Sequence, residues 1–130
     1  MYRKNLWGSK ESKSGVGSEL ANTSNVRKII SNLITELNVK TICDAPCGDF
    51  NWIRTAIPEQ VSYSGTDIVP KMISLLNKAH GKPNRRFAHL DLANPNLELP
   101  QVDLIVCRDL LVHLSFQDGL NVLKNFKKSK

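Results

Sequence analysis

The sequence predicts an α/β fold in which helices cover both faces of a parallel sheet. Short β-branched segments alternate with segments of helical periodicity along the 130 residues, which is typical of strand–helix–strand units. The first three predicted strands each finish in an aspartate, as at the carboxyl edge of such a sheet. The length allows one domain but not two, so we expect a single sheet.

Residues 1–20 are predicted to form a polar arm, which precedes a folded domain over residues 21–130. The arm is rich in Ser, Gly and Lys, and residues 14–18 are typical of a mobile loop or linker. Trp7, however, is a large aromatic side chain in this hydrophilic segment. An alternative is therefore that the arm folds as a lid over a bound ligand.

The domain is expected to begin with a helix followed by a strand. Apolar residues recur at helical spacing over residues 26–37, with Thr23 or Ser24 as the N-cap and Asn38 as the stop. The β-branched run over residues 39–44 predicts the first strand.

Later elements continue the alternation of strands with helices. A short helix is predicted over residues 50–57, ended by Pro58. The later strands are predicted over residues 61–67, 86–91 and 102–107, and the later helices over residues 70–79, 110–114 and 115–126. Pro70 suits the first turn of its helix, and Ser115 or Asp118 can cap the last one.

The net charge of +6 comes from the two ends of the chain. Basic residues outnumber acidic ones in residues 1–13 and 124–130, whereas the segment between them is close to neutral. A nucleic-acid interface needs positive charge clustered on folded elements, so no nucleic-acid partner is expected. No segment approaches the roughly 18 consecutive apolar residues of a membrane span. The start of the chain also has no signal-peptide core, which predicts a cytoplasmic protein.

The three cysteines, Cys43, Cys47 and Cys107, are expected to be free and buried. An odd number argues against a disulfide framework and fits a reducing compartment. The spacing of Cys43 and Cys47 is not the one common in zinc sites, and no histidine lies close to them in sequence. No metal is therefore expected.

Asp44, Asp67 and Asp91 end the first three predicted strands. Right-handed crossovers bring the carboxyl ends of parallel strands to one edge of a sheet, where ligands bind in open α/β folds. Carboxylates at that edge can accept hydrogen bonds from hydroxyl and amino groups, but they repel phosphates. For any one of them alone, the alternative is an ordinary turn residue.

Four segments resemble the motifs of class I S-adenosylmethionine-dependent methyltransferases. Residues 42–52 resemble the first motif, in a bacterial subgroup whose loop reads Asp-Ala-Pro-Cys-Gly-Asp. Residues 63–70, 86–92 and 102–114 resemble the second, third and fourth motifs, in the same order. The resemblance implies a Rossmann-like sheet with strand order 3-2-1-4 and S-adenosylmethionine as the cofactor.

The first motif implies a site for the methionine end of the cofactor. The backbone of Ala45, Pro46, Cys47 and Gly48 would wrap that end, with Gly48 permitting close approach. Asp44 would orient the loop and the methionine amino group.

The second and third motifs imply a site for the adenosine end. Asp67 would accept the ribose hydroxyls, and Ile68 would pack on the adenine face. Asp91 would accept from the adenine amino group, with the Leu92 backbone beside it.

The fourth motif implies the methyl-transfer side of the site. Arg108 would border the cofactor there. Where the acceptor carries a proton, Asp109 or His113 would act as the base. The alternative for His113 is a packing or capping residue in a short helical turn.

Two features depart from the family pattern. Pro46 and Phe50 replace the first and third glycines that the loop usually carries. Family members also usually continue for three more strands, so we expect an incomplete sheet and a fragment of a longer protein. The fourth strand would then be an exposed edge that allows self-association.

The sequence therefore predicts methyl transfer from S-adenosylmethionine to a small-molecule or other unidentified acceptor. One alternative is a non-catalytic module that keeps the cofactor pocket. Another is an NAD-dependent oxidoreductase, which is disfavoured because its fingerprint needs three glycines after the first strand. Here only Gly48 follows that strand, between Asp44 and Asp49, whose charges would repel a pyrophosphate.

Overall fold

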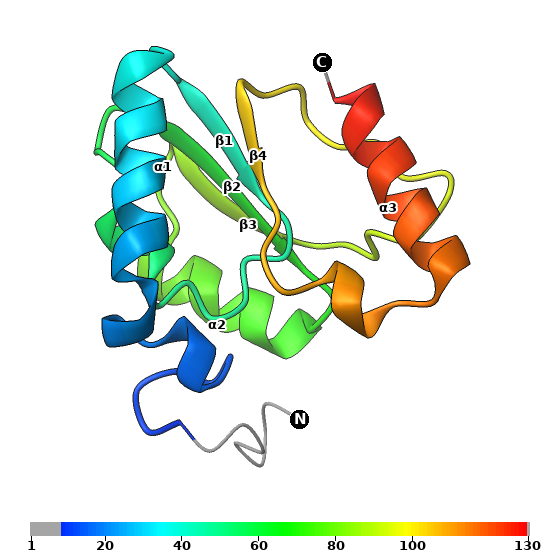
Figure 1. Ribbon diagram of the computed structural model, residues 1–130, viewed down its shortest axis with the longest axis horizontal. Helices are drawn as coiled ribbons and strands as arrows, with labels where there is room; N and C mark the ends of the chain where they lie inside the picture. The colour runs from blue at the N-terminus through cyan, green and yellow to red at the C-terminus, as the bar shows by residue number, and fades with distance from the viewer. Residues whose placement is uncertain (1–8, 130) are drawn as a thin grey trace.

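The computed structural model describes residues 9–129, in which four parallel strands form one sheet (Figure 1). The strand order is β3-β2-β1-β4, which confirms the predicted topology. The strands are β1 (Thr41–Asp44), β2 (Ser62–Asp67), β3 (Arg85–His89) and β4 (Leu104–Val106). The helices are α1 (Ser24–Glu36), α2 (Pro70–His80) and α3 (Phe116–Lys128). Trp7 lies outside the described residues.

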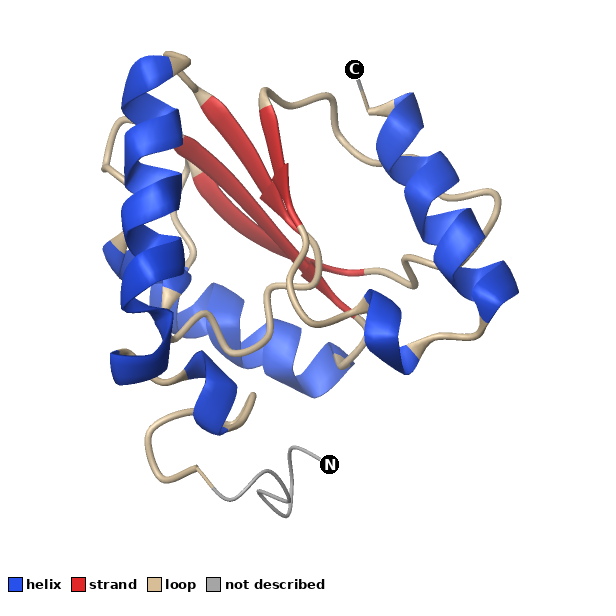
Figure 2. Cartoon of the chain, viewed as in Figure 1, coloured by secondary structure: helices blue, strands red, loops and turns tan. Residues whose placement is uncertain are grey.

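The strands form a central layer with helices on both sides (Figure 2). Ile34 of α1 and Ile73 of α2 join one apolar cluster with Ile42 of β1. Val122 of α3 joins a second cluster with Cys43, the strand neighbour of Ile42 that points to the opposite face. Burying one such aliphatic side chain stabilises the fold by about 1.5–3 kcal/mol. The two clusters therefore fix the sheet between α1 and α2 on one side and α3 on the other.

Helix α1 stops where the sequence predicts, but its start is not capped as expected. Asn38 has a φ of 52°, the left-handed conformation that asparagine tolerates after a helix. Thr23 occupies the N-cap position without a side-chain capping bond. Its hydroxyl instead donates to the carbonyls of Glu19 and Leu20, because a 3₁₀ turn leads directly into the helix.

The helix predicted over residues 50–57 is wrong. Only a 3₁₀ turn, Ile53–Thr55, forms there. Phe50 has a φ of 63°, outside the helical region, and its ring packs against the rings of Tyr63 and Phe87. Pro58 restricts the other end of the segment, so only one turn fits between them.

The strands are shorter than predicted, and Asp91 lies beyond the end of β3. β3 stops at His89, and Asp91 Oδ1 accepts a hydrogen bond from the backbone of Ala93 in the following turn. The prediction that this aspartate ends a strand is therefore wrong by two positions. At the other edge, Asp103 Oδ2 accepts from the backbone of Lys40 and Thr41, which ties the start of β4 to β1.

The last helix is capped as predicted and anchors the loop after β3. Ser115 accepts from the Asp118 backbone, and α3 runs to Lys128, two residues beyond its predicted end. The buried Asn125 amide donates to the carbonyls of Leu92 and Asn94. This loop is therefore held at the carboxyl edge of the sheet. None of the helices within residues 9–129 is long and apolar enough to cross a membrane.

Candidate functional site

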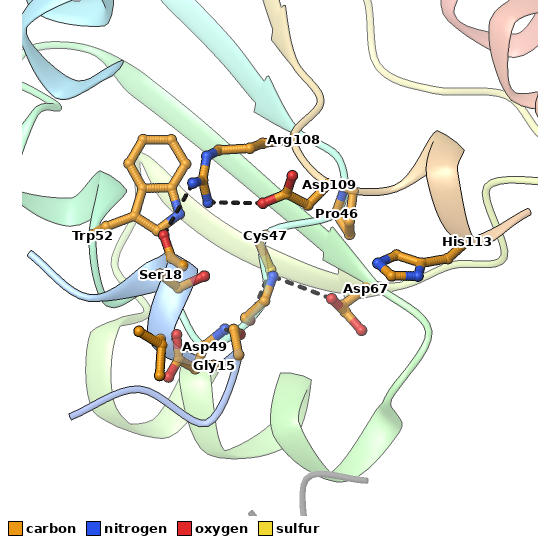
Figure 3. A pocket seen from close by; sticks show the side chains of 14 residues that line it. Gly15, Ser18, Pro46, Cys47, Asp49, Trp52, Asp67, Arg108, Asp109 and His113 are labelled. Atoms are coloured by element: carbon orange, nitrogen blue, oxygen red, sulfur yellow. Dashed lines mark hydrogen bonds and ion pairs between the residues drawn. The ribbon is translucent and has the colours of Figure 1, made fainter. Parts of the chain in front are cut away.

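Two adjoining cavities lie at the carboxyl edge of the strands, and Pro46 and Asp67 line both. The larger has a volume of about 440 Å³ and the smaller of about 230 Å³. The larger lies between the N-terminal arm, the loop after β1 and the turn after β4 (Figure 3). The smaller lies between the segments that follow β2 and β3 and apolar side chains of the β4 turn and α3. In open α/β sheets, ligands bind at this carboxyl edge of the strands.

The arm is fastened to the loop after β1 through Asp49. Asp49 Oδ2 accepts from the Ser12 hydroxyl at 2.8 Å and from the Lys13 backbone at 2.7 Å. The Asp49 backbone in turn donates to the Ser14 hydroxyl at 3.0 Å. Residues 14–18 are thus not the linker that their composition suggests, because Val16–Ser18 form a 3₁₀ turn against the cavity.

Asp67 sits at the junction of the two cavities and also shapes the loop. Its Oδ2 accepts from the Gly48 backbone at 3.1 Å, and its Oδ1 accepts from the Val69 backbone at 3.2 Å. Burial raises the pKa of Asp67, while these backbone hydrogen bonds act in the opposite direction. Each carboxylate oxygen has a second lone pair, so further hydrogen bonds can form toward the cavities.

Asp44 lies behind the loop and is almost completely buried. The Tyr63 hydroxyl donates to its Oδ2 at 2.6 Å, whereas its Oδ1 has no partner within the described structure. Burial raises the pKa of Asp44 to about 7, against the lowering effect of the Tyr63 hydrogen bond. Asp44 is therefore a buried acid with one unsatisfied oxygen.

Arg108 contacts three other residues that line the larger cavity, namely Trp52, Gly17 and Asp109 (Figure 3). Its guanidinium lies 5.5 Å from the centre of the Trp52 ring, a cation–π contact. It also donates to the Gly17 carbonyl of the arm at 3.0 Å and pairs with Asp109 at 3.1 Å. Asp109 has a φ of 56°, so the chain turns sharply directly after Arg108. His113 lies beside Asp67 at the other side of the same cavity.

The smaller cavity is mainly apolar. Ile68 is 60% exposed at its rim, and Leu92 is buried in its wall. Leu110 and Leu114 line it from the segment after β4. Asp91 supplies an exposed carboxylate. This combination of apolar walls and a few polar groups is typical of sites for flat organic ligands.

The structure brings together most of the residues that the sequence predicts for the site. The predicted residues that line at least one cavity are Pro46, Cys47, Gly48, Asp67, Ile68, Asp91, Leu92, Arg108, Asp109 and His113. Asp44 and Ala45 line neither, since they lie beneath the loop, where the Ala45 backbone donates to the Val106 carbonyl. The expectation that all cysteines are buried is wrong for Cys107, which is exposed.

Several other lining residues were given no role in the site from the sequence. They are Trp52 on the larger cavity, and Val69, Leu90, Ala93, Leu110, Leu114 and Val122 on the smaller. Residues 14–18, in the arm for which a lid is the alternative, and Asp49, at the end of the predicted loop, also line the larger cavity. Gly15 of the arm has a φ of 100°, which favours glycine.

Three solved structures illustrate the similarity of this fold to known proteins. The N-methyltransferase NodS from Bradyrhizobium japonicum WM9, in complex with S-adenosyl-L-homocysteine, is 13% identical with a TM-score of 0.74; the match covers 98% of this chain and 66% of that one. Magnesium protoporphyrin IX methyltransferase from Synechocystis PCC 6803, with bound S-adenosylhomocysteine, is 15% identical with a TM-score of 0.67, over 98% and 60%. The 1,6-didemethyltoxoflavin-N1-methyltransferase from Burkholderia thailandensis is 15% identical with a TM-score of 0.58, over 86% and 50%.

The chain thus spans half to two thirds of the length of these structures. A comparison with curated proteins finds no match. One family model, described as a methyltransferase domain, matches residues 43–129. This segment contains all four strands of the sheet except the first two residues of β1. The chain therefore belongs to the methyltransferase domain family.

Proposed function

We propose that the chain binds S-adenosylmethionine across the two adjoining cavities and transfers its methyl group to an acceptor in the larger one. The observation that carries this proposal is the position of Asp67 at the junction of the cavities. A carboxylate there suits the ribose of a nucleoside whose base enters the smaller cavity and whose amino-acid tail enters the larger. The family match over residues 43–129 supports the same reaction.

The buried Asp44 fits the amino group of the cofactor. Its Oδ1 is a buried acceptor with no partner among the described residues, a state that costs free energy unless a donor arrives. A ligand ammonium, reaching it directly or through water, would satisfy that oxygen. A dinucleotide fits less well, since its pyrophosphate would approach the carboxylates of Asp44, Asp49 and Asp67 together.

The smaller cavity fits the adenine. Ile68 and Leu92 offer apolar contacts to a flat ring, and the Asp91 carboxylate can accept from an exocyclic amino group. Asp67 keeps one lone pair on each oxygen beyond its bonds to the Gly48 and Val69 backbones. Those lone pairs suit the two ribose hydroxyls.

S-Adenosylmethionine, when bound, supplies an electrophilic methyl group on a sulfonium sulfur. The protein's part is then to align the acceptor and to exclude water. The arm residues 14–18 and Trp52 enclose one side of the larger cavity. We assign proton removal from the acceptor to Asp109 or His113, because both residues line the larger cavity.

The N-terminal arm, residues 1–20, is proposed to act as a lid. Its described part is held by Asp49 and Asn51 in the segment after β1 and by Arg108 on the turn after β4. Asp49 and Arg108 border the larger cavity. Opening of the arm would admit the acceptor, and closing would exclude water from the site.

The remaining proposals concern setting and partners. The Asp-Ala-Pro-Cys-Gly-Asp loop supports membership of the bacterial subgroup that shares it, and the free cysteines support a reducing, cytoplasmic setting. A small-molecule acceptor is supported by the size of the larger cavity. The Burkholderia structure holds such a molecule, 1,6-didemethyltoxoflavin, together with S-adenosylhomocysteine.

Self-association through β4 is also proposed. Within the sheet of residues 9–129, β1 pairs with one edge of β4 and no strand pairs with the other. Val112 and Phe116, in the segment after β4, are 82% and 84% exposed. Sedimentation should show a concentration-dependent dimer that Phe116→Lys weakens. A wild-type monomer at every concentration would contradict this proposal.

Isothermal titration calorimetry tests the proposed function directly. Wild-type protein should bind S-adenosylhomocysteine at one site and give no heat with NAD. Asp67→Asn should weaken that binding at least tenfold, since it replaces an acceptor of two hydroxyl donors by a poorer one. Incubation with methyl-labelled S-adenosylmethionine and a panel of amine and hydroxyl compounds then identifies the acceptor. Binding of NAD but not of S-adenosylhomocysteine would overturn the proposal.

A further inference from the structure

We propose that Tyr63 is a positioning residue for the cofactor's amino group, because it holds one oxygen of Asp44 and leaves the other for the ammonium. This inference rests on the proposed function, since it concerns how S-adenosylmethionine is recognised. Tyr63 lies on β2 at the start of the second motif, touches neither cavity, and is given no role by the family resemblance. Its effect on a ligand would therefore pass entirely through Asp44.

The contact between the two side chains is short and fully enclosed. The Tyr63 hydroxyl donates to Asp44 Oδ2 at 2.6 Å, and both residues are at most 2% exposed. Asp44 Oδ1 has no partner within the described residues. One oxygen is thus fixed by the protein, which orients the carboxyl and leaves the second oxygen as an acceptor for a ligand.

Gly65 makes this contact possible. Tyr63 and Gly65 point to the same face of β2, and Gly65 pairs with Asp44 across the β1–β2 register. A Cβ on Gly65 would lie 3.0 Å from Tyr63 Cε1 and 2.8 Å from Phe87 Cδ1. The absence of a side chain at position 65 therefore lets the Tyr63 ring extend along the strand as far as Asp44.

Packing alone does not explain the hydroxyl. The Tyr63 ring lies 4.9 Å from the Phe50 ring and 5.8 Å from the Phe87 ring, in an aromatic cluster that a phenylalanine would fill equally well. A buried hydroxyl without a polar partner would be a cost. Its partner is Asp44, so the hydroxyl acts on that carboxyl.

No cation within the described residues compensates the Asp44 carboxylate. Neither ion pair of residues 9–129 includes it. The titratable groups that face it are Tyr63 and Asp67 from β2, Cys43 from β1, Cys47 from the loop and Cys107 after β4. Burial raises the pKa of Tyr63 and of the buried Cys43 and Cys47, so these two thiols and the phenol stay neutral. An ammonium would be the first positive charge to reach Asp44.

Cofactor binding is therefore coupled to a proton. Burial raises the pKa of Asp44 to about 7 in the free protein, and a bound ammonium favours the ionised form. Affinity should rise with pH through about 7 and then level off, with release of a proton on the acid side. The Tyr63 hydrogen bond lowers the pKa of Asp44, so its removal moves this rise to higher pH.

The test compares two ligands in wild-type protein and in Tyr63→Phe. S-Adenosylhomocysteine carries the amino group, whereas 5′-methylthioadenosine shares the nucleoside and lacks the amino-acid tail. Affinities are measured by calorimetry between about pH 6 and 8, in buffers of different ionisation enthalpy to count protons. Asp44→Asn serves as the second variant, because it keeps an acceptor for Tyr63 and removes the charge. Thermal unfolding of each variant checks that it is folded.

For a rise of about one pKa unit in Asp44, we expect Tyr63→Phe to weaken S-adenosylhomocysteine about fivefold at pH 7 and about ninefold at pH 6, and to leave 5′-methylthioadenosine within about twofold. Asp44→Asn should weaken S-adenosylhomocysteine and abolish the rise with pH. Equal weakening of both ligands in Tyr63→Phe, or an unchanged pH profile, would overturn the inference and leave the proposed function standing. Failure of wild-type protein to bind either ligand would overturn both.

Discussion

Ser14 lies directly over Gly48: a Cβ built on Gly48 would come within 2.4 Å of the Ser14 hydroxyl oxygen. Gly48 also has a φ of 54°, the left-handed region that favours glycine. The arm therefore rests on the one position of the loop after β1 that has no side chain. Both the backbone shape of the loop and the closeness of the arm depend on this glycine.

Gly48→Ala should therefore displace the arm and destabilise the fold. The left-handed backbone alone costs about 1–2 kcal/mol for a residue with a Cβ, and the clash with Ser14 adds to it. Denaturant unfolding measures this loss, and calorimetry should show weaker binding of S-adenosylhomocysteine. Gly119→Ala is the matched control, since a Cβ there meets open space on α3 and should stabilise by about 0.5–1 kcal/mol. Equal stability of the two variants would contradict the role of Gly48.

Asp49→Ala should loosen the arm at residues 12–14, while the Asn51 side chain still donates to Glu11 and to the Ser18 carbonyl. The Asp49 side chain accepts from Ser12, Lys13 and the Asn51 backbone, and each such hydrogen bond contributes about 0.5–1.5 kcal/mol. Hydrogen exchange at Lys13 and Ser14 should become faster in the variant, while exchange in β1 and β2 stays unchanged. Ser12→Ala removes one of these bonds and should have a smaller effect in the same direction. Protection that persists at Lys13 in Asp49→Ala would show that the arm is held by other contacts.

Arg108→Lys should loosen the arm although it keeps the positive charge. The planar guanidinium lies over Trp52, reaches the Gly17 carbonyl and pairs with Asp109 at the same time, whereas an ammonium is a single point charge. Trp52 fluorescence, read in a Trp7→Phe background, should change in intensity and become easier to quench. Lys124→Met on α3 removes a charge remote from the cavities and serves as the control. Identical quenching of Trp52 in both proteins would rule out this role of Arg108.

The topology and the shared sheet edge were predictable because they follow from periodic features of the sequence. Asp44 and Asp67 each end a short predicted strand, and parallel strands connected by right-handed crossovers bring such ends together. Asn38 was predictable for a related reason. Asparagine is one of the few residues that tolerate the left-handed conformation after a helix, so its position alone marks the end of α1.

Phe50 shows why the segment after the loop could not be predicted. It adopts the same left-handed region as Asn38, but phenylalanine carries no local preference for it. The conformation is compensated by tertiary contacts, since the ring is buried against Tyr63 and Phe87. Contacts with side chains on other strands leave no pattern in the local sequence. The composition of residues 50–57 therefore suggested a helix.

The contacts between the arm and Asp49 could not be predicted for a different reason. Ser12, Lys13 and Ser14 are residue types that occur in any linker, and their common partner Asp49 lies about 35 positions further along the chain. Only the folded loop after β1 brings the Asp49 carboxylate within reach of them. A polar, glycine-containing segment can therefore line a cavity without any periodic pattern in its sequence.

Stability should rise as the pH falls from about 8 to about 5, which is the opposite of the usual effect of a paired carboxylate. The ordinary pKa of an aspartate is 3.8, and burial raises that of Asp44 to about 7 in the folded protein. Between these values the folded state binds more protons than the unfolded state, so stability falls as the pH rises through this window. At about 1.4 kcal/mol per pKa unit, the loss is roughly 4 kcal/mol from below pH 4 to above pH 7, and roughly 3 kcal/mol of it falls between pH 5 and pH 8.

Thermal unfolding as a function of pH measures this dependence, and Asp44→Asn should remove most of it. Burial also raises the pKa of Asp67 and lowers that of His80, so two smaller contributions of opposite sign should remain in that variant. Asp103→Asn is the control. Backbone hydrogen bonds from Lys40 and Thr41 lower the pKa of Asp103, so the contribution of Asp103 to stability is lost only below about pH 4. This variant should therefore leave the slope between pH 5 and pH 8 unchanged. Saturation with S-adenosylhomocysteine should flatten the wild-type slope, because a bound ammonium stabilises the ionised Asp44. A wild-type pH dependence that Asp44→Asn leaves unchanged would show that the Asp44 carboxyl takes up no proton on folding in this range.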